Sequence, residues 1–119
     1  MKRYLRLLVP IIFAITAFAS TLNTSEAAKH VGENATVCGV VAGVHTATSS
    51  KGSPTFVNLD KTYPNQVFTI LIWGSDLSKF SPAPASWEGK RVCATGTITL
   101  YRNVPEIVAH ETGQINFPK

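Results

Sequence analysis

The sequence predicts a single all-β domain over residues 28–119, behind an export signal over residues 1–27. Of the 119 residues, 45% are hydrophobic and 15% are charged, which is enough apolar material for one core and argues against a disordered chain. Five short β-branched or apolar runs follow one another, separated by segments rich in Gly, Pro, Ser and Asn. A short helical pattern lies between the third and fourth runs.

The N-terminal segment is typical of a secretory signal peptide. Lys2, Arg3 and Arg6 give it a basic start, and the uncharged, mostly apolar run Leu7–Ala19 follows. As a helix, this run would be about 20 Å long, which is too short for a hydrocarbon core of about 30 Å. An uncleaved membrane anchor is therefore the weaker alternative, and we expect a periplasmic or secreted protein with no stable membrane anchor after cleavage.

The cleavage site has two candidates. Ser25-Glu26-Ala27 has small residues at both positions that a signal peptidase reads, and Ala17-Phe18-Ala19 has them too. We expect cleavage after Ala27, because this site directly precedes the first strand-like pattern. The mature chain from Ala28 then has 8 basic and 6 acidic residues, so its net charge falls from +4 to +2. Attraction of the whole surface to nucleic acid or anionic lipid is then weak.

The first two strands are predicted over Thr36–His45 and Thr55–Leu59. The first contains Gly39 and Gly43, and a glycine inside a strand marks a bulge or a sharp bend. The polar residues 46–54 form the loop between the two strands. Along the second strand, alternation directs the side chains of Val57 and Leu59 to the core and those of Phe56 and Asn58 outward.

The third strand is predicted over Val67–Trp73, after a turn over residues 60–66. It is the most apolar run and is expected to be central. Ser75 is predicted to cap a short helix that runs to Phe80 and is ended by the prolines that follow. Alternation on this strand leaves two possible core faces: either Phe68, Ile70 and Ile72, or Thr69, Leu71 and Trp73.

The fourth and fifth strands are predicted over Lys90–Tyr101 and Pro105–Ala109. Arg102-Asn103 forms the tip of the hairpin between them, and residues 111–119 are expected to be irregular. Five short strands with one helical segment between the third and fourth is the element order of a five-stranded Greek-key barrel of the OB-fold.

The two cysteines, Cys38 and Cys93, lie on strands that this order makes antiparallel neighbours. Both point away from the core and on the same side if alternation holds, so we favour a structural disulfide over two free thiols. A redox site is not expected, because a Cys-x-x-Cys spacing is absent from the sequence. The residues taken to face inward on these strands are Val37, Gly39 and Val41, with Val92, Ala94, Gly96 and Ile98.

The chain also resembles a family. The motifs that carry the resemblance are Val31-Gly32, Phe56-Val57-Asn58-Leu59, Tyr63-Pro64-Asn65-Gln66-Val67-Phe68-Thr69, Glu88-Gly89-Lys90-Arg91-Val92, Thr95-Gly96, Leu100-Tyr101-Arg102, Pro105-Glu106-Ile107 and Gln114-Ile115. With these, the chain is similar to small exported bacterial proteins built from one OB-fold of the anticodon-binding, nucleic-acid-binding type. The resemblance covers nearly all of His30–Ile115, and it implies an OB-fold more specifically than it implies a ligand.

Catalytic and metal-binding patterns are absent from the sequence. His30, His45 and His110 stand at no metal-binding spacing, and the Gly-x-Ser-x-Gly motif does not occur. We expect neither a metal nor a cofactor, and no enzymatic activity. The carboxylates of residues 28–119 fall at loops, caps or strand edges, where solvation explains them: Glu33, Asp60, Asp76, Glu88, Glu106 and Glu111.

The ligand face is predicted on strands two and three, because the loops after the first and fourth strands of an OB-fold flank its groove. We expect weak binding of single-stranded nucleic acid or another anionic polymer, with bases stacked on aromatic side chains. The alternative is an envelope stress or interaction protein that binds a small molecule or a protein through the barrel. The predicted nucleic-acid-binding residues are Lys51, Phe56, Asn58, Lys61, Tyr63, Tyr101 and Arg102.

Overall fold

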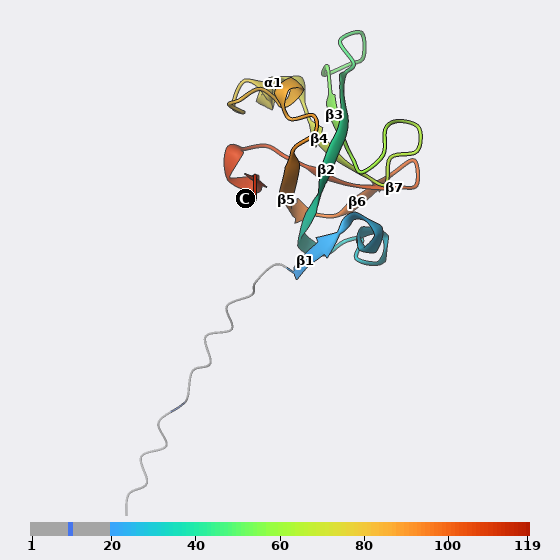
Figure 1. Cartoon of the computed structure of the whole chain (residues 1–119), viewed down its shortest axis with the longest axis vertical. Coiled ribbons are helices and arrows are strands. Elements are labelled where there is room, and N and C mark those ends of the chain that lie inside the picture. The colour runs from blue at the N-terminus through green and yellow to red at the C-terminus, as the bar shows by residue number, and fades with distance from the viewer. Residues whose placement is uncertain (1–9, 11–19) are drawn as a thin grey trace, which may run out of the picture.

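The computed structural model describes residue 10 and residues 20–119, and this part of the chain is predominantly β-structure (Figure 1). The strands are β1 (Ser20–Asn23), β2 (Asn34–Thr46), β3 (Thr55–Leu59), β4 (Phe68–Ile72), β5 (Arg91–Thr97), β6 (Thr99–Tyr101), β7 (Val104–Val108) and β8 (Ile115–Asn116). The short helices are η1 (Thr24–Lys29), α1 (Gly74–Leu77), η2 (Pro84–Ser86) and η3 (Thr112–Gln114). The prediction of an all-β domain is therefore confirmed. The basic start and most of the apolar run of the predicted signal peptide lie outside the described residues.

The strands form one sheet in the order β6-β7-β4-β3-β2-β5-β8, and β1 pairs with β2 outside this path. Strand β2 is long, so its first half pairs with β5 while its second half pairs with β3. The β4–β7 and β1–β2 pairs are parallel, and the other pairs are antiparallel. None of the helices in the described part is long and apolar enough to cross a membrane.

The predicted count of five strands in a closed barrel is wrong, because the described part has eight strands in an open sheet. One reason is that the predicted fourth strand divides at Ile98. The Ile98 N–H donates to the Glu33 carbonyl at 3.0 Å, and the Ile98 carbonyl accepts from the Gly32 N–H at 2.7 Å. The backbone of Ile98 therefore pairs with the segment before β2, and β5 and β6 become separate strands.

A second reason is that both ends of the described region join the sheet. Ser20–Asn23 pairs with Ala35–Cys38 of β2, and β8 pairs with β5 through Cys93↔Asn116 and Ala94↔Ile115. The C-terminal segment was expected to be irregular, but Gln114 fixes it by donating from Nε2 to the carbonyls of Thr95 and Val108, at 3.0 and 3.1 Å.

The N-terminal elements pack against the domain. Leu22 of β1 and Ala27 of η1 are both part of the hydrophobic core, and Ala27 has no exposed surface. The Thr24 hydroxyl donates to the Asp60 carboxylate, whose other oxygen accepts from the Val40 N–H at 2.9 Å. Cleavage after Ala27 stays a prediction, and it would remove β1 and most of η1 from this packing.

The predicted helix from Ser75 to Phe80 is shorter than expected and begins earlier. Helix α1 covers Gly74–Leu77, and Trp73 occupies its N-cap position without a side-chain hydrogen bond. Gly74 must begin the turn because its backbone packs against the preceding loop: the Gly74 N–H donates to the Gly52 carbonyl at 2.9 Å, and a Cβ on Gly74 would lie 2.8 Å from that oxygen. This tertiary contact overrides the capping preference of Ser75.

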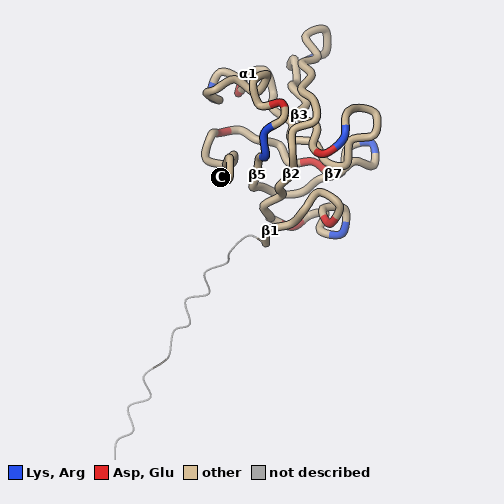
Figure 2. The backbone as a smooth tube through the Cα atoms, in the orientation of Figure 1, with Lys and Arg blue, Asp and Glu red and all other residues tan. Residues whose placement is uncertain are grey.

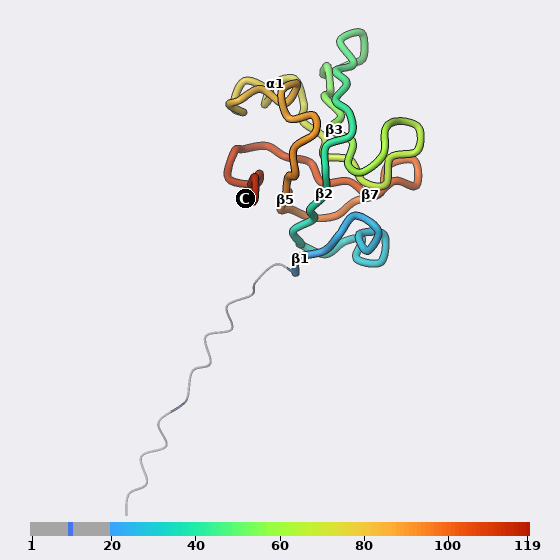
Figure 3. Tube along the Cα trace, viewed as in Figure 1, coloured from blue at the N-terminus to red at the C-terminus, as the bar shows by residue number. Residues whose placement is uncertain are grey.

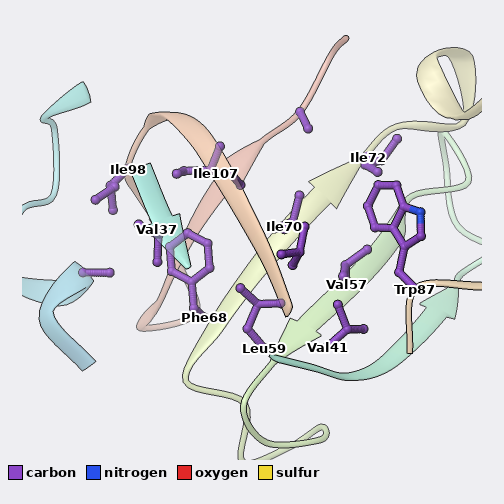
Figure 4. Packing of buried hydrophobic residues seen from close by; sticks show 14 of the residues in the cluster. Val37, Val41, Val57, Leu59, Phe68, Ile70, Ile72, Trp87, Ile98 and Ile107 are labelled. Atoms are coloured by element: carbon purple, nitrogen blue, oxygen red, sulfur yellow. The ribbon is translucent and has the colours of Figure 1, made fainter. Parts of the chain in front are cut away.

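The core lies on one face of β2, β3, β4, β5 and β7 (Figure 4). On β4, Phe68, Ile70 and Ile72 are fully buried in it, which settles the choice that alternation left open. The inward residues predicted on β2 and β5 include Val37, Val41, Val92, Ala94 and Ile98, and all of these are buried as expected. The side chain of Trp87 closes the end of the core and donates from Nε1 to the Pro82 carbonyl at 3.0 Å.

Cys38 and Cys93 form a disulfide, as predicted. They are directly opposite each other on β2 and β5, and their Sγ atoms are 2.04 Å apart. The bond suits a protein of an oxidising compartment. The bend expected at the glycines of β2 is also present, since the register with β3 shifts between Val41 and Gly43.

Candidate functional site

A cavity of about 700 Å³ lies on the face of β3, β4 and β7 that points away from the core. Its walls come from the segment between β3 and β4 and from the β6–β7 turn. These appear in Figure 3 as a yellow-green loop and an orange loop side by side. The lining residues are His45, Ser50, Phe56, Asn58, Tyr63, Pro64, Gln66, Thr69, Tyr101, Arg102, Val104 and Glu106.

The floor of the cavity is a row of three polar side chains. In the register of the sheet, Asn58 of β3 is opposite Thr69 of β4, and Thr69 is opposite Glu106 of β7. The adjacent row, Val57, Ile70 and Ile107, is fully buried in the core, so alternation turns the polar row to the other face. The Thr69 hydroxyl donates to Asn58 Oδ1 at 3.1 Å, and both residues are buried.

Glu106 is a buried carboxyl group at this floor. The residue is only 7% exposed, and no hydrogen bond or ion pair to its carboxylate occurs among the residues that the structure describes. Burial raises the pKa of Glu106 above its ordinary value of 4.5, because the charged form loses water without gaining a partner. The expectation that Glu106 lies at a loop, cap or strand edge where solvation accounts for it is therefore wrong, because Glu106 lies inside β7, which is paired on both sides, and is buried.

A second acceptor lies at the same cavity. The Oε1 atom of Gln66, in the segment before β4, is buried and has no hydrogen-bond partner in the described part of the chain. Buried polar atoms in folded proteins are nearly always paired, so an unpaired one at a cavity wall is a candidate contact for a ligand. With Glu106, it makes the inner part of the cavity rich in oxygen acceptors.

Aromatic side chains form the outer part. Tyr63 is 74% exposed, Tyr101 is 50% exposed, and Phe56 of β3 is half-buried. Arg102 lies at the tip of the β6–β7 hairpin, where Arg102 and Asn103 have positive φ angles of 49° and 64°, as in a two-residue type I′ turn. The guanidinium carbon of Arg102 is 5.3 Å from the centroid of the Tyr101 ring. This hairpin therefore places a positive charge beside an aromatic ring at the rim of the cavity.

Five of the seven predicted site residues line this cavity: Phe56, Asn58, Tyr63, Tyr101 and Arg102. Lys51 and Lys61 are exposed and do not line it, although Ser50, next to Lys51, does. Figure 2 shows Lys and Arg on separate loops and strands of the described part. The cavity thus gathers aromatic groups around one rim cation, and positive charge is not concentrated there.

Seven lining residues were not predicted from the sequence: His45, Ser50, Pro64, Gln66, Thr69, Val104 and Glu106. The signal for two of them was present, because Thr69 and Glu106 alternate with core residues on their strands and must face the same side as Asn58. Gln66 could not be found in this way, since it belongs to an irregular segment that only tertiary packing positions.

The histidines do not assemble a metal site. Within residues 20–119, no group of three or more His, Cys, Asp or Glu side chains is placed to hold a metal ion. His30 Nδ1 is 2.7 Å from Glu33 Oε2, and His110 Nδ1 is 3.0 Å from Asp76 Oδ2. Hydrogen bonds from Lys79 and His110 lower the pKa of Asp76.

We expect Glu106→Gln to raise the melting temperature at pH 7. In the unfolded chain the carboxyl group regains its ordinary pKa of 4.5, whereas in the fold its pKa is higher. The folded protein therefore binds more protons between these two values, and stability falls as pH rises through them. Glutamine has no charge, so its burial does not carry this cost. In thermal unfolding, the melting temperature of the variant should exceed that of wild type at pH 7 and differ little from it below pH 4.5. An equal increase at both pH values would show that the charge of Glu106 is not the reason.

Comparisons with known proteins find the fold but no family. No protein-family model and no curated protein matches the chain. A crystal structure assigned to an aspartyl-tRNA synthetase from Leishmania major Friedlin is similar, with a TM-score of 0.51 and 12% sequence identity. The similarity covers 92% of this chain but only 22% of the synthetase chain. At this identity the likeness concerns the fold alone.

Proposed function

We propose that this protein is a non-catalytic binding module that holds single-stranded nucleic acid in the cavity on β3, β4 and β7. The observation that carries the proposal is the joint lining of one cavity by Phe56, Tyr63 and Tyr101, with Arg102 at the rim. Flat aromatic rings stack on bases of any sequence, and a nearby cation neutralises phosphate.

We also propose that the sheet has the strand arrangement of an OB-fold, although it does not close into a barrel. The strand pairing supports this: β2, β3 and β4 form a meander, β7 pairs in parallel with β4, and β5 pairs with the first half of β2. The similar synthetase fold adds support, since the name of that protein ties it to tRNA. In OB-folds, the face of the second and third strands binds oligonucleotides, and β3 and β4 hold those places here.

We place the module outside the cytoplasm, in the periplasm or secreted. The support is the basic, apolar N-terminal sequence together with the Cys38–Cys93 disulfide, because structural disulfides persist in oxidising compartments. We take the apolar run Leu7–Ala19 to be part of a signal peptide that is cleaved on export.

Fluorescence anisotropy with a labelled oligothymidine at several salt concentrations tests the function. We expect weak, micromolar binding with a salt slope of about −2, from roughly three neutralised phosphates at about −0.7 each. Arg102 would neutralise one of them, and Lys51 and Lys61, which are exposed on the loops next to the lining residues Ser50 and Tyr63, would neutralise the other two. Arg102→Ala should reduce the slope by about 0.7, because one phosphate contact is lost. Arg91→Ala is the matched control, since Arg91 is exposed on β5 and does not line the cavity.

Stacking is tested by Phe56→Ala, which should weaken binding about tenfold at every salt concentration, because stacking contributes about 1–3 kcal/mol per base. Phe56→Leu keeps apolar volume but removes the flat ring, so it should weaken binding nearly as much. Absence of binding to wild-type protein at tens of micromolar in low salt, both for oligothymidine and for a strand of mixed base sequence, would contradict the nucleic-acid function.

A small-molecule or protein ligand is the second candidate, and Glu106 is the observation that favours it. Glu106 is 7% exposed and its carboxylate has no partner among the described residues, so at the floor of a cavity of about 700 Å³ it suits an amine. Ligand cavities commonly measure about 300–1,000 Å³. Calorimetric binding of a small aromatic amine, lost in Glu106→Gln, together with no oligonucleotide binding would support this candidate.

A further inference from the structure

We propose that the floor of the cavity selects a base edge with adjacent N–H donors, so that guanine is the preferred base at this position. This inference rests on the proposed function and adds base selection to it. The acceptors of the inner cavity are the carboxylate of Glu106 on the floor and the buried Oε1 of Gln66 in the wall, and both lack a partner among the described residues.

The chemistry of the floor excludes phosphate from it. A carboxylate repels an anion, and its cost of burial is recovered only when donors reach its oxygens. The cation of the cavity, Arg102, lies at the exposed hairpin tip beside Tyr101. A nucleotide therefore fits with its base edge inward on Glu106, its ring between the aromatic walls and its phosphate outward toward Arg102.

Among the four DNA bases, guanine alone offers two neighbouring donors on one edge, N1–H and N2–H₂. The two oxygens of a carboxylate accept such a pair side by side, in the manner of bidentate recognition. Adenine and cytosine offer one amino group next to a ring nitrogen acceptor, which would face the second carboxylate oxygen. In thymine, N3–H lies between two carbonyl oxygens. For these three bases, attraction at one atom is offset by repulsion at the next.

The backbone of Glu106 is held on both sides, because it pairs with Thr69 of β4 and with Thr99 of β6. The other two side chains of the floor, Thr69 and Asn58, are joined by the hydrogen bond from the Thr69 hydroxyl to Asn58 Oδ1. A carboxylate on a strand with both edges paired costs little to organise when the base binds.

The test compares short oligothymidines that carry one central guanine, hypoxanthine or thymine. Hypoxanthine is guanine without the 2-amino group, so the guanine and hypoxanthine strands differ by a single donor. We expect wild-type protein to bind the guanine strand about tenfold more tightly than the hypoxanthine strand. Glu106→Gln should reduce this ratio to near one, and Glu88→Gln, which removes an exposed carboxylate outside the cavity, should leave it unchanged.

The outcomes separate this inference from the function on which it rests. Binding of all three strands with equal affinity would overturn guanine selection and leave the nucleic-acid function standing. A guanine preference that persists in Glu106→Gln would overturn the assigned role of this carboxylate. If none of the strands binds, both proposals fall. The comparison of guanine with hypoxanthine uses wild-type protein, so the test does not depend on how the variant folds.

Discussion

A chain that begins at Ala28 should be much less stable than one that begins at Ser20. The shorter chain lacks β1 and most of η1, and with them the buried side chain of Leu22 and the hydrogen bond from Thr24 to the Asp60 carboxylate. Burial of a leucine contributes about 1.5–3 kcal/mol. A hydrogen bond to a charged group contributes about as much. The free energy of unfolding should therefore fall by about 3–6 kcal/mol, measured by urea denaturation.

Point variants show whether packing is the cause. Thr24→Val keeps the shape of the side chain but removes the donor to one of the two Asp60 carboxylate oxygens, so it should cost about 1.5–3 kcal/mol. Ser25→Ala is the control, because Ser25 is exposed and, within residues 20–119, its hydroxyl bonds only to Asn23 Oδ1, two residues earlier. Equal stability of the two chain lengths would mean that β1 contributes nothing to the fold.

The same packing bears on where the signal is removed. Cleavage after Ala19, the second candidate, leaves β1 and η1 in place, whereas cleavage after Ala27 removes them. The sequence pattern favours cleavage after Ala27, but this packing favours the site after Ala19. We therefore now expect the mature protein from the native host to retain Ser20–Ala27, because a peptidase that cut within η1 would remove part of the core. Intact-mass measurement distinguishes the two products by these eight residues. A mass that begins at Ala28 would contradict the expectation.

Removal of the disulfide should be the second large effect. The Cys38–Cys93 bond closes a loop with a sequence separation of 55 residues. In the chain-entropy description, such a crosslink stabilises a protein by about 4 kcal/mol through its restriction of the unfolded chain. We expect the double variant Cys38→Ala, Cys93→Ala to melt at least 10 °C lower, at about 4–8 °C per kcal/mol for a domain of this size.

Wild-type protein treated with a reductant is the matched comparison for the double variant, since it lacks the bond but keeps the sulfur atoms. Both should lose similar stability if the crosslink is the cause. Thiol titration of unfolded, unreduced protein should find no free thiol, and two free thiols per chain would contradict the bond itself.

Much of the fold could be predicted because it depends on local alternation. The second strand, Thr55–Leu59, has the predicted bounds, and β2 and β5 direct their expected residues to the core. The disulfide followed from the same alternation, which put Cys38 and Cys93 on one side of neighbouring strands. The aromatic part of the cavity was predictable for a related reason: Phe56 and Asn58 alternate with core residues, and the hairpin tip brings Arg102 close to them.

The sequence alone thus determined where the five main strands lie and which face of the first, second and fourth predicted strands is buried, and it favoured a Cys38–Cys93 bond, because hydrophobic period and element order are local or nearly local properties. Only the tertiary structure decided which face of β4 is buried, that Ser20–Asn23 joins β2 and that Ile98 divides a strand. It also decided that Glu106 is buried with no side-chain partner among the described residues. These features depend on which distant segment covers or pairs with a residue. A glutamate that alternates away from a core is exposed or buried according to the loops that fold over it, and the pattern of one strand does not contain that information.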